Sequence, residues 1–155
     1  MKLPTSRLFD WSVLFIVILL LAAFFGREMK KVQGQAEAAT IKATLGALRT
    51  AFVLDHLMQQ VRGRGKSVAS GQRNPFLLLE QVPSNYGGEP GAEGHASGSW
   101  LFDPVCVCIG YRPVHSQFLE NAGASQALWF RVSAPPGPFQ VTPMERYVWQ
   151  GDVVQ

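Results

Sequence analysis

Proline is missing from a long part of the chain: none occurs between Leu8 and Val61, and nine of the ten prolines follow that region. Glycine is sparse there as well, at only Gly26, Gly34 and Gly46. Because proline kinks or ends a helix and glycine weakens it, the usual helix-ending signals are absent. We therefore expect a long helix in the first half of the chain and a turn-rich second half.

Clustered positive charge is absent outside the N-terminal region. The formal net charge is +3; residues 1–31 hold five Lys/Arg and two Asp/Glu, and the remaining 124 residues hold nine of each. A nucleic-acid-binding domain would show a basic patch on its folded part. The sequence therefore predicts no nucleic-acid partner, and its net positive charge comes from residues 1–31, which flank an apolar segment.

That apolar segment, residues 11–25, reads WSVLFIVILLLAAFF, and Ser12 is its one weakly polar residue. As a helix it spans about 22 Å, and Leu8, Phe9 and Gly26 extend it toward the ~30 Å hydrocarbon core of a bilayer. A cleaved signal peptide is the alternative. However, Phe24 and Phe25 lie at the end of the apolar run, where a cleavage site needs small residues. We expect a retained anchor over residues 1–26. The flanking charges barely decide its orientation, and a cytoplasmic N-terminus with a translocated head is the simpler insertion.

Two adjoining apolar rows follow the anchor at helical spacing. One row is Val32, Ala36, Ala39, Ala43, Ala47, Ala51, Leu54, Met58 and Val61; the other is Ile41, Leu45, Leu48 and Phe52. Steps of three and four residues are typical of an amphipathic helix, so residues 27–62 are expected to continue the anchor helix with one wide apolar face. A separate surface helix with a hinge near Gly34 is the alternative.

Residues 63–155 have the composition of a small β-rich head. Asn74-Pro75 predicts a short helix over 75–81, since Asn is a good N-cap and Pro suits the first helical position. Strands are expected at 99–103, 105–113, 127–133 and 146–150, the first two joined by a turn at Asp103-Pro104. The predicted fold is α+β: a long N-terminal helix, transmembrane then amphipathic, packed on a small antiparallel sheet.

Signals for chemistry are weak. GRGKS at 63–67 lacks the first glycine of a phosphate-binding loop, because position 60 is Gln60, and no strand precedes it. No arrangement of nucleophile and base, and no framed pair of carboxylates, stands out. We predict a non-enzymatic protein without catalytic residues, a cofactor or a small-molecule substrate.

The other candidate residues also favour structural roles. Cys106 and Cys108 would share one face of a strand, where they are poorly placed to bridge each other. With His115 they leave a metal-ligand set incomplete, and His56 and His95 lie elsewhere, so no metal site is expected. The aromatic side chains that could stack a sugar or base are more typical of a small core; they are Trp100, Trp129 and Trp149.

The plan of an apolar N-terminal segment, a long amphipathic helix and a small β head resembles that of type IV pilins and pseudopilins. The stretch TLGALRTAFVLDHLMQQ, then NPFLLLEQVPSNYGGE, SWLFD and a strand ending in GYRP, is similar to accessory proteins of mannose-sensitive haemagglutinin (MSHA) pilus biogenesis. The resemblance covers roughly residues 40 to 113. It departs at the leader: Ser6-Arg7-Leu8-Phe9-Asp10 has no Gly cleavage site, and no Glu lies in the apolar run.

The resemblance implies a membrane-anchored, pilin-like component of type IV (MSHA-type) pilus biogenesis or type II secretion assembly. Its expected partners are the lipid bilayer and other pilin-like or assembly proteins. It would be a single-pass protein of the bacterial inner membrane with a periplasmic head, staying there or joining a filament by other contacts. The alternative is a bitopic envelope scaffold whose head binds a partner by strand addition.

Overall fold

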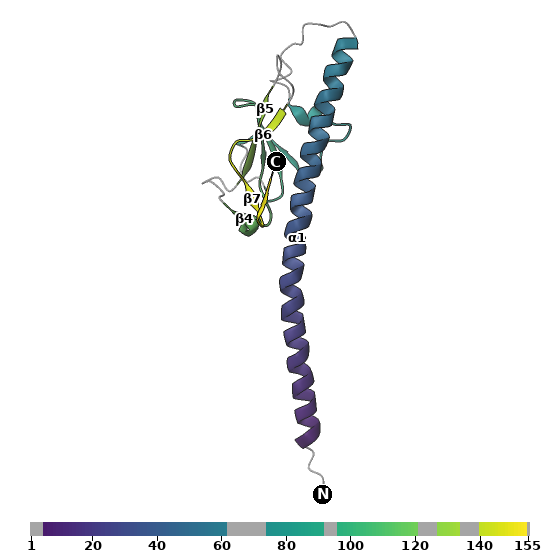
Figure 1. Ribbon diagram of the computed structural model, residues 1–155, viewed down its shortest axis with the longest axis vertical. Coiled ribbons are helices and arrows are strands. Elements are labelled where there is room, and N and C mark those ends of the chain that lie inside the picture. Colours follow the sequence, from purple (N-terminus) through teal and green to yellow (C-terminus); the bar gives the residue numbers. More distant parts are fainter. Residues whose placement is uncertain (1–4, 62–73, 92–95, 121–126, 134–139, 155) are drawn as a thin grey trace. The chain divides into compact units, whose positions relative to one another are not determined.

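The computed structural model describes residues 5–61, 74–91, 96–120, 127–133 and 140–154 (Figure 1). The chain divides into two compact units, Met1–Ala36 and Glu37–Gln155, and helix α1 (Thr5–Val61) contributes residues to both. The helical assignment continues through Gly34, so the alternative of two separate helices is not observed. The GRGKS stretch lies outside the described residues, as does His95.

The first unit consists, in its described part, of the N-terminal segment of α1. All residues from Phe9 to Gln33 are exposed, including the whole apolar run. By length and composition α1 can cross a membrane, and none of its apolar window is buried. In water such a surface would be costly, since exposed apolar area is unfavourable by about 25 cal/mol per Å².

The second unit, Glu37–Gln155, is called the head from here on, and α1 contributes one narrow row to its core. Ile41, Leu45, Leu48 and Phe52 are all at most 1% exposed. The steps of four, three and four residues keep these side chains on one stripe of the helix. Only this row of the wide apolar face is fully buried: of the other row, Ala43, Ala47, Leu54, Met58 and Val61 are exposed.

The strands form two sheets (Figure 1). The larger has the order β1-β2-β3-β5-β6, from β1 (Tyr86–Gly88), β2 (Trp100–Asp103), β3 (Cys108–Tyr111), β5 (Leu128–Ser133) and β6 (Gln140–Pro143). The smaller has the order β4-β7-β8, from β4 (Leu119–Glu120), β7 (Val148–Trp149) and β8 (Asp152–Val153). The predicted β2–β3 hairpin and β5 are confirmed, and β7 lies inside the predicted 146–150 strand.

One edge of the larger sheet differs from the expectation of an antiparallel sheet. Strand β1 pairs with β2 in parallel, whereas the other pairs are antiparallel. Strand β1 lies in the stretch between the predicted short helix and the first predicted strand, where no strand is expected, and it runs in the same direction as β2. The fold is thus α+β, with a helix packed on a mostly antiparallel sheet.

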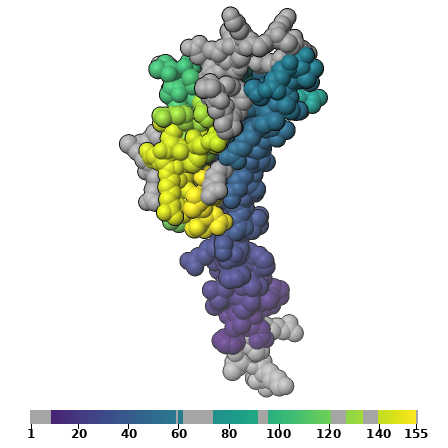
Figure 2. Space-filling model, turned by 45° about the horizontal axis from the view of Figure 1, so that its top comes forward, coloured from purple at the N-terminus to yellow at the C-terminus, as the bar shows by residue number. Residues whose placement is uncertain are grey.

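The core lies between the inner face of the larger sheet and the row from α1. Cross-strand neighbours fill it in register: Trp100, Tyr111 and Leu128 form one rank, and Phe102, Ile109 and Phe130 the next. Figure 2 shows the C-terminal segments, in yellow, packed along the blue part of α1. There Arg49 Nη2 donates to the Val141 carbonyl of β6 at 3.0 Å.

The segment that begins at Asn74 is held to this core, and the Asn74 side chain fixes its start. Its Oδ1 accepts the Phe76 N–H at 3.0 Å, which caps a short 3-10 helix, η2 (Pro75–Leu78), and its Nδ2 donates to Tyr86 Oη. The Phe76 ring, fully buried, lies 4.7 Å from the Tyr86 ring and 5.9 Å from that of Trp100. The predicted capping is confirmed, but the helix is shorter than 75–81: Leu79 is already extended.

Candidate interaction surface

The apolar row that α1 leaves open forms one wall of a groove in the head. The groove has a volume of about 620 Å³. Its walls come from the second half of α1 and from the residues at the end of η2; they are Ala47, Thr50, Ala51, Leu54, Asp55, Met58, Leu78, Leu79 and Glu80. A concave and mainly apolar surface of this size suits a docked apolar side chain or helix more than a polar substrate.

Large apolar side chains on and beside the groove remain in contact with solvent. Leu54 and Met58 are 53% and 56% exposed, and the neighbouring Leu77 is 65% exposed. Asp55 and Glu80 place carboxylates among these side chains. An apolar surface bordered by charge is typical of a protein-binding patch.

The edges of the larger sheet offer little to a partner that adds a strand. On the β6 side, Met144 N–H donates to the Trp129 carbonyl, so by antiparallel alternation the polar groups of Val141 and Pro143 point outward. The Val141 carbonyl is already bound by Arg49, and Pro143 has no N–H. On the other side, β1 has three residues, and its Tyr86 N–H donates to the Pro83 carbonyl.

The start of the head is fixed by one carboxylate. Glu37, whose side chain is 8% exposed, accepts from Tyr111 Oη at 3.0 Å, from Val114 N–H at 2.6 Å, from His115 N–H at 3.0 Å, and pairs with His115 Nδ1 at 2.8 Å. Burial raises the pKa of Tyr111, and the charge of Glu37 and its hydrogen bond raise it further. These contacts tie α1 to the segment after β3, which makes Glu37 a structural group.

The expectation for the two cysteines is wrong: Cys106 and Cys108 form a disulfide. Residues 104–107 form a turn, and β3 begins only at Cys108, so Cys106 is not on a strand. Val107, at φ 54°, turns the backbone and brings the two Cα atoms to 5.2 Å, within bridging distance. The role expected for Asp103 is confirmed, because its Oδ1 accepts the Val105 N–H in this turn.

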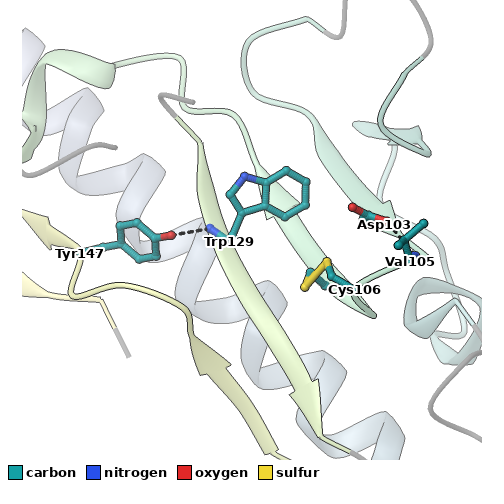
Figure 3. Close-up of a disulfide and its surroundings, with 6 residues drawn as sticks. Asp103, Val105, Cys106, Trp129 and Tyr147 are labelled. Carbon is teal, nitrogen blue, oxygen red and sulfur yellow. Dashed lines mark hydrogen bonds between the residues drawn. A yellow bond between two sulfur atoms is a disulfide. The ribbon is translucent and has the colours of Figure 1, made fainter. Parts of the chain in front are cut away.

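The tryptophans lie in different places. Trp100 and Trp149 are buried at no more than 2% exposure. Trp129 is half-buried on the outer face of the sheet (Figure 3). Its indole lies against Gly110, and a Cβ atom at position 110 would come within 2.8 Å of the indole ring. The backbone N–H of Trp129 donates to Tyr147 Oη at 2.9 Å. Burial raises the pKa of Tyr147. The interior position expected for these aromatic residues therefore holds for two of the three.

The histidines within the described ranges do not converge. His56 is on α1 beside Gln60, and His115 is bound to Glu37. Across the part of the chain that the structure describes, no three His, Cys, Asp or Glu side chains gather in a metal-binding cluster.

Comparison of the chain with protein-family models, with curated proteins and with solved structures gave no match. The exposed apolar segment of α1 and the groove are therefore the features from which a function can be inferred.

Proposed function

We propose that the chain is a non-enzymatic, membrane-anchored component of an envelope assembly, of the pilin-like kind used in type IV (MSHA-type) pilus biogenesis or type II secretion. One observation carries the proposal. A single helix is apolar and exposed on all sides from Trp11 to Phe25, and further along it supplies the buried row of a folded head.

The anchor part of the proposal is supported by the side chains of that run. Ile16, Leu19 and Phe24 are 56%, 52% and 62% exposed, as expected for a helix whose solvent is lipid. Arg27, Lys30 and Lys31 follow the run, where they would meet the headgroup region.

The position of the head outside the cytoplasm is supported by the Cys106–Cys108 disulfide. Disulfides persist in oxidising compartments such as the periplasm and are rare in the cytosol. A disulfide in the head thus favours an N-terminus in the cytoplasm and a periplasmic head.

The interaction part of the proposal is supported by the groove. Its open apolar side chains are set on a helix and on a capped segment, and such rigid elements suit a permanent contact with another assembly protein. The alternative of strand addition has less support, because β1 is short and the β6 edge is occupied at Val141.

The test uses two variants of one helix. Leu54 and Val53 are both 53% exposed, but only Leu54 lines the groove. We expect Leu54→Lys to abolish recovery of pilus or secretion proteins with the full-length chain, and Val53→Lys to preserve it. Equal recovery with both variants would exclude the groove. Unchanged pilus and secretion output after deletion of the whole protein would refute the proposed function itself.

A further inference from the structure

The Cys106–Cys108 disulfide joins two sulfurs that differ in access. Cys106 is exposed in the turn after β2, whereas Cys108, the first residue of β3, is fully buried. Figure 3 shows the bridge beside Asp103 and Val105, at the end of the hairpin. A thiolate arriving from solvent therefore reaches the Cys106 sulfur and not that of Cys108.

The bridge stabilises the fold little, and the residue between its two cysteines has an unfavourable backbone conformation. It closes a loop with a sequence separation of two, and stabilisation by loop closure increases with loop length. The residue between the cysteines, Val107, has φ 54°, a conformation that is strained for a β-branched side chain. Exposed or strained disulfides are the labile ones, whereas structural disulfides resist reduction.

The strand partners of Cys108 are one arginine and one aspartate. Val132 N–H donates to the Val107 carbonyl at 3.1 Å, so by alternation Cys108 and its partner Arg131 form a non-hydrogen-bonded pair with close side chains. The pairing thus places a cationic residue on the strand next to the departing sulfur. On the other side of Cys108 is Asp103, whose Oδ1 is engaged by the Val105 N–H.

We propose that the Cys106–Cys108 disulfide is a thiol–disulfide exchange site, reduced by the dithiol of an oxidoreductase. A thiolate of the partner attacks Cys106 Sγ and forms a mixed disulfide, while the Cys106–Cys108 bond breaks and Cys108 leaves as a thiolate that takes a proton. The second partner thiolate attacks the partner sulfur of the mixed disulfide, which releases Cys106 and oxidises the partner. The chain gains two electrons and two protons.

Reduction changes the sheet next to the bridge. Without the bond, Val107 is free to return to negative φ, which moves the carbonyl that accepts the Val132 N–H. The exchange site thus controls one hydrogen bond between the turn and β5. Neither the exchange nor this hydrogen bond depends on the assembly role proposed above.

The test uses the full-length chain in detergent micelles and a glutathione buffer at the reducing poise of a cytosolic pool. After alkylation, mass spectrometry should find both cysteines reduced while the head stays folded. A structural disulfide would resist such a pool, so reduction under these conditions identifies a labile bridge. Trapped glutathione should be found on Cys106. A bridge that stays oxidised until urea unfolds the head, or glutathione trapped on Cys108, would overturn the proposal.

A second measurement uses hydrogen exchange to follow the effect of reduction on β5 in the same chain. On reduction, hydrogen exchange at the Val132 amide should become at least about tenfold faster, as expected when one protecting hydrogen bond is lost. The Trp129 amide on the same strand, which donates to Tyr147, should keep its protection. Unchanged exchange at Val132 would contradict the link between the bridge and β5.

Discussion

Helix α1 presents apolar side chains to two different surroundings. From Phe9 to Gln33 every side of the helix is exposed, whereas from Ile41 to Phe52 a single row is buried and its neighbours stay open. An all-round apolar surface suits hydrocarbon, where each face meets lipid; a single row suits a helix with one face on a protein core. The two regions share one secondary structure and differ in how much of the helix surface is exposed.

The largest expected effect separates two phenylalanines of this helix. Phe52 is 1% exposed and Phe24 is 62% exposed. We expect Phe52→Ala to lower the free energy of unfolding of the head by about 3–5 kcal/mol, because it leaves a cavity in the core. Phe24→Ala should change it by less than about 0.5 kcal/mol. Thermal unfolding of the full chain in micelles, followed by tryptophan fluorescence, measures both. Equal losses of stability in the two variants would contradict the different burial of Phe52 and Phe24.

The next effect tests the solvent of the first region. Ile18 lies in the middle of the apolar run, and an arginine there should cost about 2.5–3.5 kcal/mol of membrane insertion. We expect Ile18→Arg to reduce the membrane-integrated fraction, measured by alkaline extraction. Val53→Arg, at an exposed position in the head, should leave that fraction unchanged. Full integration of Ile18→Arg would argue against a lipid environment for this region.

The sequence predicts these two regions unequally. The apolar run needs no context, since its length and composition alone show that a helix there could cross a membrane. The buried row of α1 is visible as one of two rows, but spacing does not tell which row meets a sheet, because Leu54 and Met58 have the same apolar character as Leu45. In the structure, Leu54 lies in an open groove that Leu78 and Leu79 also line.

The parts of the head that the sequence does not predict have a common cause, which is that they depend on backbone geometry or distant contacts. The disulfide depends on positive φ at Val107, and a β-branched residue gives no sequence signal for that conformation. Strand β1 is hidden in a Gly-rich stretch, and Glu37 looks like one more polar residue on the outer side of a helix. Its four hydrogen bonds come from residues more than seventy positions away in the chain.

A smaller effect is expected where the head begins. Glu37→Gln places an amide among N–H and O–H donors, so at least one buried donor loses its acceptor, at about 2–3 kcal/mol. Glu28→Gln, at an exposed position of the first region, should cost less than about 0.5 kcal/mol. Urea unfolding of both variants checks this pair. A stable Glu37→Gln protein would show that the carboxylate is not needed to fix the start of the head.

The smallest effect is a pH dependence confined to the head. Burial, then the charge of Glu37 and its hydrogen bond, raise the pKa of Tyr111 above the value of about 10 that it has in the unfolded chain. Above pH 10 the unfolded chain loses this proton while the folded head keeps it. The stability that Tyr111 contributes is therefore complete below pH 10 and falls as pH rises, by up to about 1.4 kcal/mol per pH unit.

The variant Tyr111→Phe removes this one titration. Its stability should fall less steeply above pH 10 than that of the wild type, and a residual slope should remain because burial also raises the pKa of Tyr86 and Tyr147. Urea unfolding at several pH values gives both slopes. Identical slopes would mean that Tyr111 is not held protonated by its place beside Glu37, and that the boundary of the head is looser than its hydrogen bonds indicate.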